Sequence, residues 1–553
     1  GPARPAGPGG RPPTYTPRME GRAFDRASMI DGLSAQQFDV LVIGGGITGC
    51  GVALDAASRG LSVALVERGD FAAGTSSKSS KLVHGGLRYL QQGEVRLVYE
   101  ALRERKRLRR NAPHLVSVLP FMIPILTRDG LVNRKIARAL GSAMWMYDLT
   151  GGWRIGRIHR RLRRNRAITH LPTMPIDRLA SAYLYFDASA DDARLCLTVA
   201  RTAADHGAVV ANYCAVTGLV HEGGRVVGAC VDTGDATVTV RASVVVNATG
   251  VWADQVHSMD DTTAQETIRP AKGIHLTVPW AKVRNDIAVV IPVPKDKRSL
   301  FVVPWGPNGD GTFRHTYVGT TDTDYDGPLD EPQCTQADID YVLRALNASV
   351  TTAITAADVT GVWAGLRPLV KTGATGRTAD LSRRHVVATS DSGLVTVTGG
   401  KLTTYREMAE DAVDVAAGLL GRRTRCRTRR LRLRGASGAG SDHLASRFGS
   451  DAQLVSALVR EDPSLGEPLV AGLAYLKAEV VHAARHEMAR SVDDVLSRRT
   501  RARLFDRVAS LAAADETARL LAAELGWDDA EAARQVEAYR ALVAAELQLP
   551  DLP

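Results

Sequence analysis

The 553-residue sequence predicts an α/β fold of several domains, because a chain of this length exceeds a single hydrophobic core. Three observations predict this fold. Residues 38–67 read as a strand, a glycine-rich turn, a helix and a second strand, which is a βαβ unit. Residues 270–330 are rich in strand-like segments, which indicates an inserted antiparallel sheet. Residues 440–553 show helical periodicity, which indicates a C-terminal helical domain.

The composition is that of a globular protein with a basic surface. Hydrophobic residues make up 45% of the chain, and no apolar run reaches the roughly 18 residues of a membrane-spanning helix. Residues 1–36 show no signal-peptide pattern and are expected to be a disordered tail. The formal charge of +10 favours an anionic partner. The six cysteines form no C-x-x-C pair, so we expect a reduced, cytoplasmic setting and no metal site.

The βαβ unit of residues 38–67 carries a dinucleotide-binding signal. Its turn reads Gly44-Gly45-Gly46-Ile47-Thr48-Gly49. Gly44 is expected to make the tight turn, Gly46 to let backbone amides reach a pyrophosphate, and Gly49 to let helix and strand pack closely. Glu67 ends the second strand, where it can accept hydrogen bonds from ribose hydroxyls, while the helix N-terminus holds the phosphates. Dinucleotide binding is therefore the leading interpretation.

Three later segments also suit a bound cofactor. Residues 69–89 form a loop of small and hydroxyl residues with cations among them, which fits close approach to a flat or anionic group. An ordinary surface loop is the alternative. Residues 242–252 read as a buried strand ending in small residues, where a second close backbone approach would fall. Residues 394–420 repeat the order of strand, Gly-Gly turn and helix, which suits a phosphate or a flavin carbonyl.

Residues 131–149 predict a basic amphipathic helix. Its apolar positions, about one turn apart, are Val132, Ile136, Leu140, Met144 and Tyr147, and its opposite side carries Arg134, Lys135 and Arg138. Such a helix suits an anionic membrane surface, and a core-facing helix with a solvated basic side is the alternative. The arginine-rich run at residues 154–166 favours the membrane, since each basic group near an anionic leaflet adds about 1 kcal/mol. Nucleic acid is not expected, because no aromatic-interleaved or zinc module accompanies these arginines.

The sequence contains six motifs that together resemble the FAD-dependent, membrane-associated glycerol-3-phosphate dehydrogenases: VIGGGITGCGVALDAASRGLSVALVE, GTSSKSSKLVHGGLRYL, NATGVWAD, GLRPL, GGKLTTYREMAED and VDDVLSRRTR. The resemblance implies a glutathione-reductase-type FAD-binding Rossmann domain with an inserted antiparallel-sheet substrate domain and a C-terminal helical domain. It also implies oxidation of sn-glycerol 3-phosphate to dihydroxyacetone phosphate, with electrons passed to a membrane quinone by a protein peripheral to the inner face of the cell membrane.

The expected domain limits follow from these segments. They are a tail at 1–36, an FAD-binding domain from 37–110, 187–262 and 370–421, a substrate- and membrane-facing domain from 111–186 and 263–369, a linker at 422–439 and the helical domain at 440–553.

A phosphate ester requires fixed cations, and arginine suits it best. Arg88, Arg367 and Lys401 lie in small-residue loops near the expected cofactor, with Tyr89 as a neutral donor. By resemblance Arg383 also binds substrate, although Arg384 stands next to it where an aspartate is expected.

The reaction needs a base for the C2 hydroxyl proton while hydride leaves C2 for the flavin. His275 is the first candidate and His84 the second, because a neutral imidazole takes a proton near neutral pH. Arg367 joins them as the third expected catalytic residue. A structural ion pair or a buried structural histidine is the alternative for each.

The residues expected to contact FAD are Gly44, Gly45, Gly46, Ile47, Thr48, Gly49, Glu67, Arg68, Thr75, Ser76, Ser77, Ser80, Lys81, His84, Gly250, Gly400 and Leu402. The expected partners are sn-glycerol 3-phosphate, a membrane quinone, an anionic membrane surface and a second copy of the chain. Two alternatives stay open: a glycerol-3-phosphate oxidase that uses oxygen, and a non-catalytic flavin- or nucleic-acid-binding module.

Overall fold

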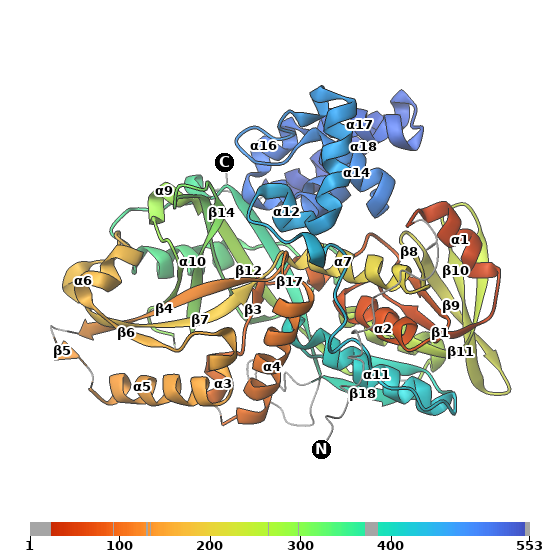
Figure 1. Cartoon of the computed structure of the whole chain (residues 1–553), viewed down its shortest axis with the longest axis horizontal. Coiled ribbons are helices and arrows are strands. Elements are labelled where there is room, and N and C mark those ends of the chain that lie inside the picture. The colour runs from red at the N-terminus through yellow and green to blue at the C-terminus, as the bar shows by residue number, and fades with distance from the viewer. Residues whose placement is uncertain are drawn as a thin grey trace, which may run out of the picture.

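Two β-sheets and a group of C-terminal helices make up the molecule (Figure 1). The computed structural model describes residues 24–91, 93–128, 131–132, 134–263, 265–296, 298–370 and 385–547. No helix among these residues has the length and apolar character needed to cross a bilayer.

The first sheet is the predicted dinucleotide-binding sheet. Its parallel strands are β1 (Phe38–Ile43), β2 (Val63–Val66), β8 (Val209–Ala211), β11 (Thr237–Asn247) and β19 (Val395–Thr398), and its antiparallel strands are β9 (Ala215–Glu222), β10 (Arg225–Asp232) and β18 (Val386–Thr389). The order β18-β19-β11-β1-β2-β8 puts β1 at the centre. Both sides of β1 and β2 are covered, which is why these strands read as continuous apolar runs.

Three helices pack around this sheet, namely α2 (Ile47–Ser58), α7 (Asp192–Asp205) and α11 (Tyr405–Leu419). Small residues let α2 approach its neighbours closely. A Cβ atom on Gly51 would lie 2.8 Å from the ring of Tyr405 on α11. The glycine- and alanine-rich sequence of α2 is therefore a packing requirement as well as a binding signal.

The second sheet is mainly antiparallel, as predicted for the insert. It consists of β3 (Leu82–Val83), β4 (Ser117–Arg128), β5 (Leu131–Val132), β6 (Arg160–Arg163), β7 (Leu179–Ser189), β12 (Ile268–Pro279), β13 (Ala288–Pro292), β14 (Ser299–Pro307), β15 (Phe313–Gly319), β16 (Thr323–Asp324) and β17 (Gly361–Val370). Its helices are α3 (Leu87–Gln91), α4 (Val95–Asn111), α5 (Arg134–Leu149), α6 (Arg164–Ala167), α9 (Trp280–Val283) and α10 (Gln336–Asn347), and α8 (Ala253–Asp260) follows β11. The chain thus passes from the first sheet into the second through the loop that precedes β3.

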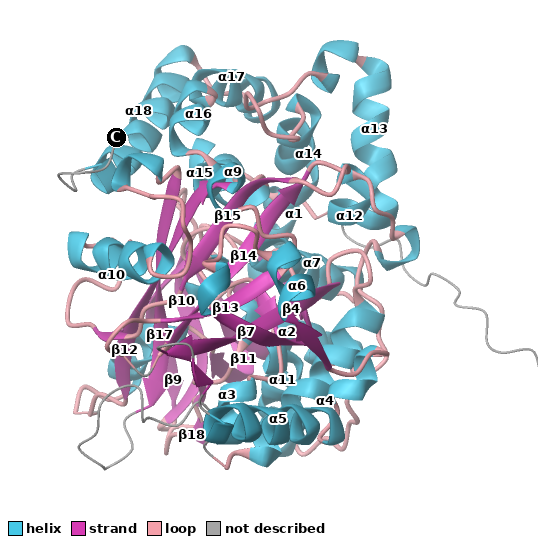
Figure 2. Cartoon of the chain, turned by 90° about the vertical axis from the view of Figure 1, so that its left-hand side faces the viewer, coloured by secondary structure: helices cyan, strands magenta, loops and turns pink. Residues whose placement is uncertain are grey.

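The C-terminal helices form a separate hydrophobic cluster. They are α12 (His443–Phe448), α13 (Ala452–Glu461), α14 (Lys477–Glu487), the π-helical turn η12 (Asp494–Arg499), α15 (Ala502–Phe505), α16 (Arg507–Ala512), α17 (Ala514–Leu525) and α18 (Asp529–Leu547). They lie at the end of the molecule opposite α3, α4 and α5 (Figures 1 and 2). Thr277 of β12 donates a hydrogen bond of 2.7 Å to the carbonyl of Leu504, which ties α15 to the second sheet.

The predicted tail is too long. Residues 26–34 form the helix α1 (Arg26–Ser34), which Asp25 caps and which buries Met29 and Leu33 against the first sheet. This helix was not predicted, because the polar and glycine-rich composition of residues 1–36 outweighed the two apolar residues. Residues 1–23 lie outside the described part of the chain. The other domain limits stay a prediction, although β3 pairs with β7 and so lies in the second sheet.

Candidate active site

A cavity of about 530 Å³ lies where β1 and β2 end, and Ile43 and Val66 are part of its wall. This is the carboxyl end of parallel strands, where open α/β sheets bind ligands. The wall continues with the turn after β1, the segment after β11 and the Gly399-Gly400 turn after β19. Its volume falls within the range of small-molecule sites.

The glycines of the first turn leave no room for side chains. Gly44 has φ +109°, and a Cβ atom on it would lie 2.8 Å from the carbonyl oxygen of Ala248. A Cβ atom on Gly49 would lie only 1.9 Å from the carbonyl oxygen of Gly44. The start of α2 therefore packs directly on the turn, and the turn on the strand end at Ala248. This is the close approach that the glycine spacing predicted.

Glu67 directly follows the second strand, as predicted, and its carboxylate fixes the neighbouring backbone by hydrogen bonds. It accepts hydrogen bonds from the backbone N–H groups of Gly45 at 2.6 Å and Gly69 at 2.8 Å. Burial raises the pKa of Glu67, and the two backbone donors oppose that shift. Ser76 reaches the start of α2, where its hydroxyl accepts from the N–H of Ile47 at 2.9 Å.

These residues fit FAD. The side-chain-free turn, the N-terminus of α2 and the acid at the end of β2 match the needs of a pyrophosphate and a ribose. Trp252 adds a flat wall, with the Arg68 guanidinium 4.6 Å from its ring centre. The Trp252 Nε1–H group is buried and has no hydrogen-bond partner among the described residues, so a donor is available for a ligand atom.

The predicted FAD residues divide into two groups. Those in the cavity wall are Gly44, Gly46, Ile47, Thr48, Glu67, Arg68, Thr75, Ser76, Gly250, Gly400 and Leu402. Those behind the wall are Gly45, Gly49, Ser77, Ser80, Lys81 and His84, which do not line it. Lys81 in particular is buried against Asp192, with Nζ 3.3 Å from Oδ1. Burial, and then the neighbouring charge of Arg501, lowers the pKa of Lys81 to about 8.

His275 lies on β12 next to the loop of residues 69–81. Its Nε2 atom is 2.8 Å from the hydroxyl of Ser80, and its ring stacks on Trp363 at 4.7 Å and 9°. The side chain is 2% exposed. Burial, and then the charges of Lys81 and Arg367, hold the pKa of His275 well below its ordinary value. The imidazole is therefore neutral near pH 7, and its Nδ1 atom has no hydrogen-bond partner among the described residues.

Arg367 lies on β17, the strand paired with β12, opposite Ala271 and so four residues along from His275. Its guanidinium donates to Asp322 at 3.1 Å, to the Thr320 hydroxyl at 3.1 Å and to the Thr321 carbonyl at 3.0 Å. Leu366 and Pro368 line the cavity, whereas Arg367 alternates to the other side of β17. Its position over Gly273 places its charge near His275 rather than in the cavity wall.

The other predicted substrate residues in the described part of the chain come from α3 and from the turn after β19, which meet. Lys401 lines the cavity, and its Nζ atom is 3.7 Å from the ring centre of Tyr89. The backbone N–H of His84 donates to the Thr403 hydroxyl at 3.2 Å, and the His84 ring faces Phe301 edge-on. Arg383 and Arg384 lie outside the described residues, as does the side chain of Arg88.

Sequence reasoning missed several parts of the wall. Trp252 stands in the NATGVWAD motif and could have been found there as a flat apolar neighbour. Asp330 and Glu331 carry no local signal, because they reach the cavity from the second sheet's long loop. They pair there with Arg68 and Lys78 respectively, which follow the βαβ unit.

Comparison with known proteins gives consistent results over nearly the whole chain. Residues 39–406 match the family described as FAD dependent oxidoreductase, and residues 426–532 match the C-terminal domain of alpha-glycerophosphate oxidase. Glycerol-3-phosphate dehydrogenase 2 of Mycobacterium tuberculosis is 42% identical over 93% of this chain and 89% of that protein. Glycerol-3-phosphate dehydrogenase of Mycobacterium leprae is 41% identical over 94% and 91%. The structure of glycerol-3-phosphate dehydrogenase from Bacillus halodurans, solved with FAD, matches with a TM-score of 0.75, 32% identity, and coverage of 94% and 96%.

Proposed function

The chain belongs to the FAD-dependent glycerol-3-phosphate dehydrogenase family, and on that premise we propose that it oxidises sn-glycerol 3-phosphate to dihydroxyacetone phosphate and passes the electrons to a membrane quinone. The observation that carries the proposal is the meeting of the cofactor cavity with Lys401 and Tyr89. This supports a cation beside the expected flavin, where a phosphate ester would bind.

Each group has a defined part in the proposed reaction. FAD, when bound, supplies the two-electron oxidation by accepting the C2 hydrogen with its electron pair. Lys401 holds the substrate phosphate, and Arg367, which does not line the cavity, adds positive charge beside His275. His275 takes the C2 hydroxyl proton, since its depressed pKa keeps it neutral beforehand. A hydrogen bond from Nε2–H to Ser80 would leave the lone pair of Nδ1 free for this proton.

The membrane contact is proposed on a different side of α5 from the one the periodicity suggested. The predicted apolar face packs inward, because Met144 and Tyr147 are buried in the second sheet's core. The core-facing alternative is therefore correct for that face. The opposite side exposes Trp145 and Leu149, which are 58% and 77% exposed, and Trp153 follows at 54%.

A basic hollow adjoins these exposed side chains and supports an anionic lipid surface as partner. It is lined by Arg103, Lys106, Arg107, Arg110, Arg154, Arg429 and Arg430. Arg154 connects this hollow to the exposed apolar side chains, since its guanidinium lies 4.6 Å from the ring centre of Tyr99 and 5.5 Å from that of Trp153. Aromatic side chains beside clustered cations suit the interface of an anionic membrane. Such a surface would bring the protein to the quinone, as a peripheral protein on the inner face of the cell membrane.

Anaerobic titration of the flavin-loaded protein with sn-glycerol 3-phosphate tests the reaction. We expect the flavin absorbance to bleach with the phosphate ester but not with glycerol. Arg367→Ala should need at least tenfold more substrate, whereas Arg344→Ala, an exposed arginine on α10, should behave like the wild type. A flavin that stays oxidised would refute the proposal. The C-terminal match leaves an oxidase as the second candidate. Reoxidation of the reduced flavin by a quinone analogue indicates a dehydrogenase, whereas reoxidation by oxygen indicates an oxidase.

Vesicle flotation tests the membrane face. Leu149→Ser with Trp153→Ser should lose binding to phosphatidylglycerol vesicles, while Val508→Ser, an exposed apolar residue at the opposite end, should bind normally. If both variants bind the vesicles equally well, the proposal that this face contacts the membrane is refuted.

A further inference from the structure

We propose that three arginines of the C-terminal domain position the loop of residues 69–81, and through Ser80 the candidate base His275. We refer to Arg498, Arg499 and Arg501 as the arginine clamp. The inference rests on the proposed function for its catalytic part and extends it to a domain in which the sequence suggested no chemical role. The clamp residues are buried, and they contact the loop at two points on either side of the cofactor-lining Thr75 and Ser76.

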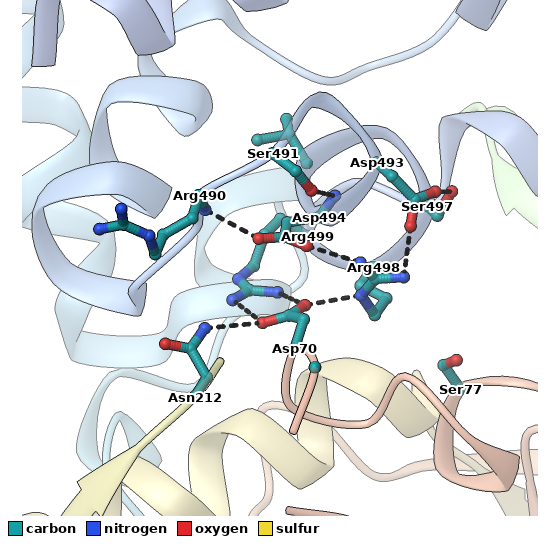
Figure 3. Close-up of polar contacts among 12 residues, drawn as sticks. Asp70, Ser77, Asn212, Arg490, Ser491, Asp493, Asp494, Ser497, Arg498 and Arg499 are labelled. Atoms are coloured by element: carbon teal, nitrogen blue, oxygen red, sulfur yellow. Dashed lines mark hydrogen bonds and ion pairs between the residues drawn. The ribbon is translucent and has the colours of Figure 1, made fainter. Parts of the chain in front are cut away.

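The first point is Asp70, which directly follows the Glu67–Gly69 segment of the cavity wall (Figure 3). Arg499 binds its carboxylate through two nitrogens, at 2.6 Å and 2.8 Å, and Arg498 Nε adds a contact of 2.6 Å. Asn212 donates a further hydrogen bond of 3.3 Å. Burial alone would raise the pKa of Asp70, but the two guanidinium groups outweigh it and lower the pKa. Asp70 is therefore a charged, fixed anchor.

The shape of η12 makes this double contact available. Neighbouring residues on an α-helix point about 100° apart, so two consecutive arginines seldom reach one carboxylate. Residues 494–499 instead form a π-helical turn, a shape that recurs at functional positions in helices. The same turn lets Asp494 accept from Arg498 at 2.6 Å and from the backbone of Arg490 at 2.8 Å, which holds the clamp itself (Figure 3).

The second point is Ser77 with Asp192. Arg501 donates through Nη2 to the carbonyl of Ser77 and, at 2.9 Å, to Oδ1 of Asp192. The other carboxylate oxygen of Asp192 accepts from the backbone N–H of Ser79 at 3.0 Å and from its hydroxyl at 2.7 Å. Asp192 is fully buried, so its carboxylate oxygens depend on these hydrogen-bond partners.

The fixed loop sets the position of Ser80. Its carbonyl accepts from the Tyr317 hydroxyl at 2.9 Å, and its own hydroxyl lies 2.8 Å from His275 Nε2. Lys81, which follows Ser80, has a positive φ of +58°, and Arg501, which contacts Ser77 and Asp192, has a positive φ of +69°. Such backbone conformations persist only where surrounding contacts fix them. Arg501, Asp192, Ser79, Ser80 and His275 thus form one continuous chain of contacts.

The test compares Arg501→Lys with Arg503→Lys. Arg503 is the matched control because it is a buried arginine of the same segment, and its hydrogen bonds go to Glu546 at 2.6 Å and to Asp493 and Ser497 rather than to the loop. A lysine at position 501 keeps the charge but loses the fork that reaches Asp192 and Ser77 together. We expect Arg501→Lys to lower kcat at least tenfold at unchanged KM, and to move the acidic limb of the kcat–pH profile. Arg503→Lys should change neither.

A double-mutant cycle separates positioning from general packing. Arg501→Lys and Ser80→Ala should be strongly non-additive in kcat, since both act on His275, whereas Arg503→Lys and Ser80→Ala should be additive. If Arg501→Lys does not fold, Ser79→Ala takes its place in the cycle, because this substitution removes no buried charge. Additive effects, or a kcat for Arg501→Lys equal to that of Arg503→Lys, would overturn the positioning role.

The Asp70 contact has a readout that needs no turnover. Arg499→Lys should weaken FAD retention at least tenfold relative to Arg503→Lys, measured by flavin release on dilution. Equal retention would overturn this half of the inference. If the wild type binds FAD but sn-glycerol 3-phosphate does not reduce the flavin, the proposed function fails. The comparison of FAD retention between Arg499→Lys and Arg503→Lys still decides the role of the clamp at Asp70.

Discussion

The contact of Gly49 with the first turn leads to a sharp prediction for Gly49→Ala. The new Cβ atom would lie 1.9 Å from the carbonyl oxygen of Gly44, and reaching the 3.0 Å that real Cβ atoms keep requires a shift of about 1.1 Å. The neighbour is backbone, so no side-chain rotation relieves the clash. Overpacking of this kind costs about 1–3 kcal/mol. If the shift displaces the amides that are expected to hold the pyrophosphate, FAD should bind roughly 5- to 150-fold more weakly.

Gly418→Ala provides the matched control. Gly418 also lies within a helix, α11, but a Cβ atom there meets nothing within 4 Å. Alanine should therefore stabilise that helix by about 0.5–1 kcal/mol. Equilibrium FAD binding, followed by the quenching of flavin fluorescence, and thermal unfolding measure both variants. If Gly49→Ala binds FAD as tightly as Gly418→Ala, the turn does not hold the cofactor in the way its geometry suggests.

Three further predictions concern single side chains. Glu67→Ala leaves the N–H groups of Gly45 and Gly69 without their acceptor, so FAD affinity should fall at least tenfold, whereas the exposed Glu222→Ala should leave it unchanged in the same binding assay. Trp252→Phe removes the buried Nε1 donor and should weaken FAD two- to tenfold, at roughly 0.5–1.5 kcal/mol, and unchanged affinity would mean that this donor does not meet the cofactor. Lys81 has a lowered pKa of about 8, so the folded state disfavours its charge. Its proton leaves the folded state before the unfolded one as pH rises, and the unfolding free energy relative to Lys81→Met should increase by up to about 3 kcal/mol between about pH 8 and pH 10. A pH-independent difference in denaturant unfolding would contradict the burial of the charged amine.

Local chemistry explains what the sequence could predict. The turn at Gly44 to Gly49, the acid at Glu67 and the Gly-Gly turn before α11 follow from short-range rules of strand, turn and helix, and the structure has them. The direction of a helix face is not local. The spacing of Met144 and Tyr147 correctly predicts an apolar side of α5, but only the sheet that covers it decides that this side faces the core.

Contacts between distant segments were beyond sequence reasoning for the same reason. Asp70 and Arg499 are 429 positions apart, and no periodicity connects them. Each alone reads as an ordinary charged residue. Likewise, Ser80 and His275 were both expected near the flavin, but their hydrogen bond depends on how β12 packs against the loop.

The arginine clamp has a consequence for how the molecule can be divided. The chain matches two separate family models, at residues 39–406 and 426–532, which suggests two modules that could be expressed alone. Cutting between them would separate Asp70 from Arg498 and Arg499, and would leave Asp192 with Lys81 but without Arg501. Breaking a buried ion pair by removing one partner costs about 3–5 kcal/mol, which is a large part of a protein's whole stability. The first module should therefore not persist as an autonomous flavoprotein. The two regions are expected to melt in one cooperative transition, so an engineered version of the protein has to keep both.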